Sequence, residues 1–121
     1  MHIGLVLEMA GEASGERLAL GSGGSGVTFA QLLARSRSAG AALARRDITT
    51  VAYVGLNSEA FPLALFASAC AGRAFAPLNY RLPDADLRRI LARTAPSLAI
   101  VDDELIERVH GVEGVELLRR S

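Results

Sequence analysis

Asn79 and Arg81 are the residues of this chain best placed to bind a ligand. They follow an apolar segment at 74–78 that is predicted to be a strand. Ligands of parallel α/β proteins bind at the carboxyl ends of strands, so the two residues are candidates for the wall of a site. An alternative requires no ligand: Asn79 would satisfy backbone groups of its own loop, and Arg81 would pair with Asp84 or Asp86.

A run of acids, Asp102-Asp103-Glu104, follows the apolar segment 98–101. Carboxylates in this position resemble the magnesium site of response-regulator receivers. That fold needs a phosphoacceptor aspartate after a later strand, but only eighteen residues follow Asp103 and none of them is an aspartate. The acids are therefore expected to cap a helix rather than to bind a metal.

The other residue types that carry chemistry are isolated. The glycine-rich run 21–26 lacks the Gly-Lys-Ser/Thr sequence of a phosphate loop, and the chain contains no lysine. Cys70 is the single cysteine and is expected to be a small buried hydrophobe on a helix. His2 and His110 are too isolated for a ligand set or a triad. We expect no catalytic residue, no bound cofactor and no metal in this chain.

The composition predicts a globular, cytoplasmic protein. Half of the 121 residues are hydrophobic, only 5% are aromatic, and the formal net charge is zero. The thirteen arginines are dispersed and are matched by thirteen acids, which argues against a nucleic-acid or anionic-membrane surface. No basic region precedes the first apolar run, so no signal peptide is expected. The apolar stretch 63–71 is too short to span a bilayer.

The first part of the chain is predicted to contain a helix, a hairpin and a second helix. Residues 2–13 have helical apolar spacing, and a short strand at 18–20 is expected to return as 27–29. Thr28 and Gln31 form the sequence of a capping box, which starts a helix that runs to about Arg46. Its inner stripe is predicted to be Phe29, Leu32, Leu33, Ser36, Gly40 and Leu43.

The remaining sequence alternates apolar strands with helices. Apolar strands of this kind predict an α/β fold with a parallel sheet covered by helices on both faces. We expect one domain over 1–121, with a hairpin and helix segment at 1–27 and an α/β layer at 28–121. The expected strands are 50–55, 74–78, 98–101 and 115–118, and the expected helices are 58–71, one that begins near Pro83 and is ended by Pro96, and 103–110.

Four segments, in this order and at compatible spacings, resemble the N-terminal region of the adenylate-forming ligases. These segments are 27–33, 56–61, 71–83 and 98–102. The tail Asn79-Tyr80-Arg81-Leu82-Pro83 is most similar to acyl-CoA synthetases. The segment 46–50 departs from the pattern, because family members usually carry Gly-Asp-Arg/Lys there. The resemblance implies a partial N-terminal subdomain of that fold, built from scaffold elements.

The resemblance also implies chemistry that lies outside this sequence. Such enzymes use ATP, magnesium and coenzyme A to convert a carboxylic acid through an acyl-adenylate to a thioester. They need a phosphate loop with a lysine, a Tyr-Gly-x-Thr-Glu segment, a ribose-binding aspartate and a C-terminal lysine. None of these segments is present, so we expect the chain alone to be inactive. Its expected partner is the remainder of a ligase or a second copy; the alternative is a stand-alone, non-catalytic interaction module.

Overall fold

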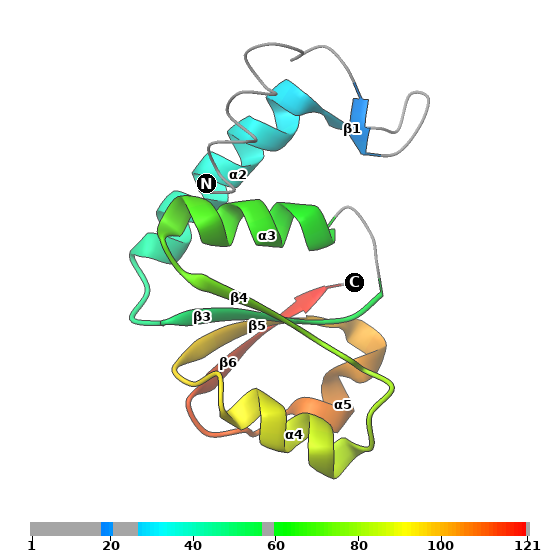
Figure 1. Ribbon diagram of the computed structural model, residues 1–121. Helices are drawn as coiled ribbons and strands as arrows, with labels where there is room; N and C mark the ends of the chain where they lie inside the picture. The colour runs from blue at the N-terminus through cyan, green and yellow to red at the C-terminus, as the bar shows by residue number, and fades with distance from the viewer. Residues whose placement is uncertain (1–17, 21–26, 57–59, 121) are drawn as a thin grey trace. The chain divides into compact units, whose positions relative to one another are not determined.

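The computed structural model describes residues 18–20, 27–56 and 60–120 (Figure 1). They belong to two compact units, one made of Met1–Arg46 with Ser58–Gly72 and the other of Asp47–Asn57 with Arg73–Ser121. The predicted helix at 2–13, the glycine-rich run and the expected cap at Asn57 or Ser58 lie outside the described residues.

The first unit contains a short hairpin and two helices. Strands β1 (Leu18–Leu20) and β2 (Val27–Thr28) pair antiparallel, as predicted, and helices α2 (Phe29–Ala44) and α3 (Ala60–Ala71) follow. The capping box is confirmed: the Gln31 N–H donates to the Thr28 hydroxyl at 3.1 Å, and the Thr28 N–H donates to the Gln31 side-chain oxygen at 2.9 Å. These bonds satisfy two of the free N–H groups at the start of α2.

Helices α2 and α3 approach each other at a glycine. A Cβ atom added to Gly40 would lie 2.7 Å from the Cβ of Cys70 and 3.0 Å from the carbonyl oxygen of Ala67. Only a residue without a side chain fits there. The predicted stripe of α2 is confirmed at Leu32, Leu33, Ser36, Gly40 and Leu43, which are buried, whereas Phe29 is half-buried.

The prediction that Cys70 is buried was wrong. Cys70 lies on α3 as expected, with its Cβ close to Gly40 of α2, but the residue is exposed. The apolar character of α3 on nearly all sides made every position look interior. Among the described residues of α3 only Ala64, Ala67 and Ser68 are buried.

The second unit is built on a parallel sheet. Its strands are β3 (Thr50–Val54), β4 (Ala74–Leu78), β5 (Ser97–Asp102) and β6 (Val115–Arg120), in the spatial order β4-β3-β5-β6. Every pair is parallel, and Val54 of β3 stands opposite Leu78 of β4 and Val101 of β5. The predicted strands 50–55, 74–78 and 98–101 are therefore confirmed as parallel neighbours in one sheet, and the α/β class is confirmed with them.

Two helices lie on one face of this sheet, α4 (Asp84–Ala92) and α5 (Ile106–Val109) (Figure 1). Asp84 and Asp86 occupy the first turn of α4, where acids offset the helix dipole. The expected helix 103–110 begins instead as a 3-10 turn, η2 (Asp103–Leu105), and becomes α-helical only for one turn. The Ile106 N–H bonds back to Asp103, the tighter spacing of a 3-10 turn.

The core of the second unit follows the alternation of the strands. The fully buried residues that share this cluster are Ala52, Val54, Leu87, Leu91, Ala99, Val101 and Val109. Val51 and Tyr53, whose side chains point to the opposite face of β3, are buried as well. The sequence predicts six core residues: Phe29, Leu33, Leu43, Phe61, Leu65 and Leu91. Of these, Leu33, Leu43 and Leu91 are buried. The other three, Phe29, Phe61 and Leu65, are only half-buried.

No helix within the described ranges is long and apolar enough to cross a membrane.

We predict that Leu91→Ala destabilises the protein by about 2–5 kcal/mol, because it removes a fully buried side chain and leaves a cavity. Leu118→Ala is the matched control, since Leu118 is 50% exposed. Its free energy of unfolding should change by less than about 0.5 kcal/mol. Denaturant unfolding followed by circular dichroism measures both, and equal midpoints for the two variants would contradict the assigned core.

Candidate functional site

The two site candidates lie on the turn that follows β4. Parallel register places this turn beside the carboxyl end of β3. The Arg81 N–H donates to the side-chain oxygen of Asn79 at 3.0 Å, and the Leu82 N–H donates to the Asn79 carbonyl at 3.1 Å. The Asn79 side chain thus satisfies its own loop, as the ligand-free alternative predicted.

Arg81 does not make the ion pair expected of it. Asp84 pairs with Arg108 and Asp86 pairs with Arg89, so both predicted partners are engaged elsewhere. The Arg81 guanidinium instead lies over the ring of Tyr80, with 5.7 Å between its central carbon and the ring centroid. That distance is typical of a cation–π contact. Arg81 itself is exposed.

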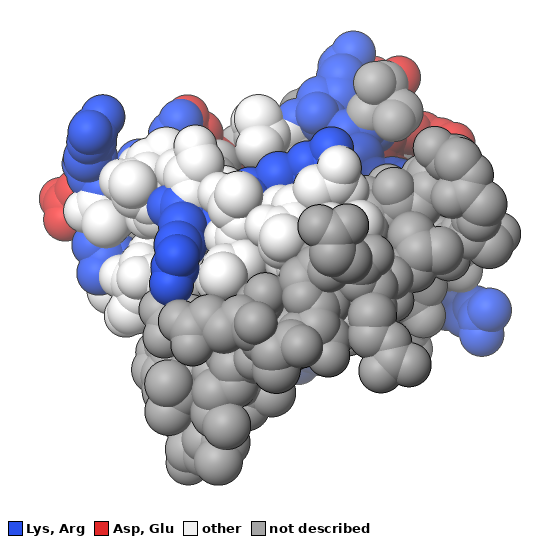
Figure 2. Space-filling model, turned by 90° about the horizontal axis from the view of Figure 1, so that it is seen from above, with Lys and Arg blue, Asp and Glu red and all other residues white. Residues whose placement is uncertain are grey.

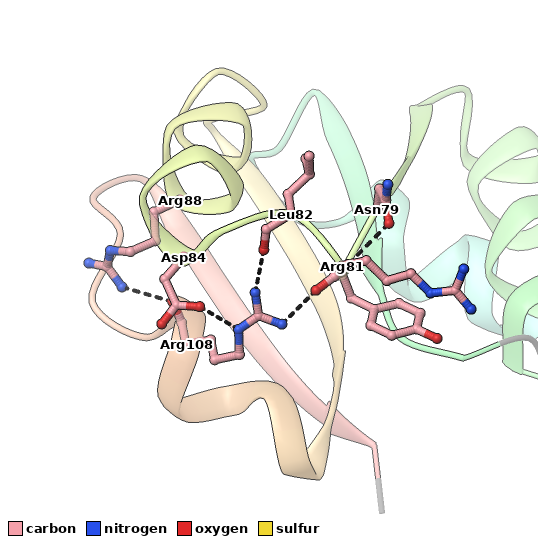
Figure 3. Close-up of polar contacts among 7 residues, drawn as sticks. Asn79, Arg81, Leu82, Asp84, Arg88 and Arg108 are labelled. Atoms are coloured by element: carbon pink, nitrogen blue, oxygen red, sulfur yellow. Dashed lines mark hydrogen bonds and ion pairs between the residues drawn. The ribbon is translucent and has the colours of Figure 1, made fainter.

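The turn is held by Arg108, a residue that the sequence did not single out. Its Nε donates to Asp84 Oδ1, its Nη1 to the Tyr80 carbonyl and its Nη2 to the Leu82 carbonyl, each at 2.5 Å (Figure 3). Arg108 comes from α5, and 24 to 28 residues separate it from these acceptors. The spacing of neighbouring residues in the sequence therefore could not predict this contact.

The acidic run does not cap a helix through Asp102. Its carboxylate accepts the Leu56 N–H at 2.8 Å and an Arg120 Nη1–H at 2.6 Å. It also fills the space beside Gly55, where an added Cβ would lie 2.5 Å from the Asp102 Cγ. Asp102 therefore joins the loop after β3 to the end of β6.

The Asp102–Arg120 pair is the better shielded of two ion pairs at this edge. The Asp102 side chain is only 4% exposed, and Arg120 covers it at 31% exposure. The hydrogen bond to Asp102 raises the pKa of the Arg120 guanidinium above its usual value, so this cation stays charged at any pH at which the protein is handled. Asp103 pairs with Arg119 at 3.0 Å, with both side chains at least half exposed.

The described residues contain no group of three or more side chains that could hold a metal ion. The polar groups at the carboxyl edge bond to loops and strand ends of the same unit. On the face seen in Figure 2, arginine side chains stand at several separate places with uncharged surface between them. These polar groups can order loops. Arg81 is an exposed cation near them that makes no ion pair with an acid among the described residues.

Comparison with known proteins places this arrangement in a family. The sequence profile described as "AMP-binding enzyme" matches residues 7–120. The chain belongs to the AMP-binding enzyme family. It corresponds to the N-terminal region of these adenylate-forming ligases, which confirms the resemblance carried by the four sequence segments.

Named relatives of this AMP-binding chain are CoA ligases. It is 37% identical over 100 residues to a feruloyl-CoA synthase of Amycolatopsis, and 33% identical over 86 residues to an indoleacetate–CoA ligase of Aromatoleum aromaticum. These matches cover 80% and 69% of the chain but only 20% and 17% of the relatives. The chain thus spans about a fifth of the length of the curated relatives it matches.

A solved structure shares the fold of the AMP-binding chain. The benzoate CoA ligase of Burkholderia xenovorans superimposes with a TM-score of 0.83 at 22% identity, over all of this chain and 26% of the ligase. At that identity the likeness concerns the fold alone.

We predict that Asp102→Asn lowers the free energy of unfolding by about 1–3 kcal/mol, because it removes the charge from a buried, doubly bonded carboxylate. Asp103→Asn is the matched control: its exposed ion pair should contribute less than about 1 kcal/mol. Chemical denaturation near neutral pH measures the free energy of unfolding of both variants. Equal losses in the two variants would show that the buried carboxylate does not join the loop to the strand.

Proposed function

We propose that this chain is the N-terminal scaffold portion of an ATP-dependent acyl-CoA synthetase. The match to the AMP-binding enzyme profile over residues 7–120 supports the proposal most directly. The curated relatives named above add to it, since each is named for a CoA thioester reaction. The parent reaction would join a carboxylic acid to AMP and then transfer the acyl group to the thiol of coenzyme A.

In this proposal the chain orders structure and the rest of the enzyme performs the chemistry. The chain has no lysine and no Ser/Thr/Gly-rich phosphate loop. Charge that develops on the triphosphate needs preorganised donors and cations, so ATP, magnesium and coenzyme A would be held by other segments. The turn with Asn79 and Arg81 would form part of the wall of the complete site. The single cysteine suits a reducing, cytoplasmic location.

The purified chain should show no ATP–pyrophosphate exchange with ferulate, indoleacetate, benzoate or a fatty acid. The physical reason is that the chain has neither a lysine nor a phosphate loop to offset the charge that develops on the triphosphate. The assay measures incorporation of labelled pyrophosphate into ATP, with an intact CoA ligase as the positive control. Exchange above the buffer blank that survives repurification would overturn the scaffold role.

The coding sequence downstream of Ser121 distinguishes this proposal from its alternative. A reading frame that continues into a Ser/Thr/Gly-rich loop with a lysine would support the synthetase. A natural stop codon directly after Ser121 would instead favour a stand-alone interaction module that lacks catalysis.

The isolated chain should associate with itself, because the remainder of the ligase is its proposed partner and is then missing. Leu56 and Leu118 are each 50% exposed, and the helix α3 is apolar on more than one side. Near-zero net charge gives little repulsion between copies. Light scattering should report a dimer or larger species, and a monodisperse monomer at high concentration would count against this prediction.

A further inference from the structure

We propose that Arg108 is the positioning residue of the turn that carries Arg81. Arg108 lies on α5 and makes no hydrogen bond to Arg81; it bonds to the carbonyls of the two residues on either side of it. The inference rests on the proposed function only where it assigns this turn to the wall of a ligase site.

The geometry of the guanidinium carries the argument. Three different nitrogens of Arg108 reach three different acceptors, and two of these are the carbonyls of Tyr80 and Leu82 (Figure 3). Those two residues flank Arg81 in the chain. Arg108 therefore fixes the Tyr80–Arg81 peptide group and, one residue beyond Arg81, the Leu82–Pro83 peptide group, while Asp84 fixes Arg108. An arginine fork suits this task because its donors lie in one rigid plane.

Tyr80 and Leu82 also pack against the hydrophobic core, but few other hydrogen bonds hold the backbone of the turn. Its own hydrogen bonds are the Arg81 N–H to the Asn79 side chain, which is exposed, and the Leu82 N–H to the Asn79 carbonyl. Exposed bonds of this kind compete with water and contribute little. The Arg108 bonds to the two carbonyls are part-buried and charge-assisted, and the Arg108 side chain is 27% exposed. They are the only charge-assisted hydrogen bonds to the backbone of this turn among the described residues.

The consequence is a set position for the Arg81 cation. Arg81 makes no ion pair with an acid among the described residues, and its guanidinium rests on the Tyr80 ring. The Tyr80 carbonyl that Arg108 holds belongs to the same residue as that ring. Releasing the carbonyl loosens the backbone that carries the Tyr80 ring and Arg81, so the cation at the carboxyl end of β4 is held less firmly in one direction.

Amide hydrogen exchange and NMR on the full 121-residue chain test this inference. Three variants are compared with the parent: Arg108→Leu, Arg108→Lys and the control Arg88→Leu. Arg88 also donates to backbone carbonyls of the second unit, those of Arg108 at 3.5 Å and His110 at 2.8 Å, but it makes no hydrogen bond to the turn. Exchange is measured at the Arg81 and Leu82 amides relative to sheet amides such as Tyr53 and Val101, and cross-peaks between the Tyr80 ring and the Arg81 side chain are recorded.

In Arg108→Leu the two turn amides should exchange about tenfold faster or more relative to the sheet, as expected for loss of charge-assisted bonds. The Tyr80–Arg81 cross-peaks should disappear. Arg108→Lys keeps the charge but not the fork, so its turn exchange should lie between that of the parent and the Leu variant. Arg88→Leu should leave the turn amides and the cross-peaks as in the parent.

Three results would overturn the inference: unchanged turn exchange in Arg108→Leu, exchange that rises only in step with the sheet amides, or a Lys variant identical to the parent. The second would mean that Arg108 stabilises the unit as a whole without positioning the turn. None of these readouts depends on catalysis, so they fail or succeed separately from the proposed synthetase function.

Discussion

The parallel pairing of β3 with both of its neighbours is the constraint on which the second unit depends. Val54 stands opposite Leu78 on one side and Val101 on the other, so the three strands end at the same edge. Their continuations, with Asn79, Leu56 and Asp102, therefore meet although they are far apart in sequence. A strand buried on both faces tolerates no slip of register, because a shift by one residue would exchange its two faces.

The polar residues at that edge serve the fold first. Asp102 accepts a loop N–H and an arginine, and Arg108 holds the turn after β4. Each of these groups is satisfied by a partner from another element, as expected for polar groups withdrawn from water. This use of polar side chains agrees with a scaffold role within the AMP-binding family. Arg81 stands apart, since its contact is an aromatic ring.

Local patterns in the sequence predicted the elements and most of their bounds. The Thr28–Gln31 capping box and the apolar strands depend on neighbours a few residues apart, and these predictions were confirmed. Residues 74–78 match β4 at both ends. The Asn79 loop bond was also anticipated, because it spans two residues.

The same local patterns did not predict contacts between residues that are far apart in the sequence. Proximity in sequence favoured Arg81 as the partner of Asp84, yet Arg108 takes that place from 24 residues away. Asp102 looked like a helix cap because a helix follows it, but its carboxylate turns to the loop after β3. Cys70 looked buried because its helix is apolar all round. The partners of Asp84 and Asp102 and the exposure of Cys70 depend on how the strands and helices pack. The spacing of residues along the sequence does not determine that packing.

A hybrid ligase tests the central proposal, that this chain is the N-terminal scaffold portion of an acyl-CoA synthetase, most directly. The chain would replace the matching fifth of the feruloyl-CoA synthase of Amycolatopsis, to which it is 37% identical. Adenylation of ferulate would be compared with that of a variant lacking the segment. The account predicts that a folded hybrid forms feruloyl-adenylate where the truncated enzyme does not. A stable, monodisperse hybrid that is no more active than the truncated enzyme would contradict it.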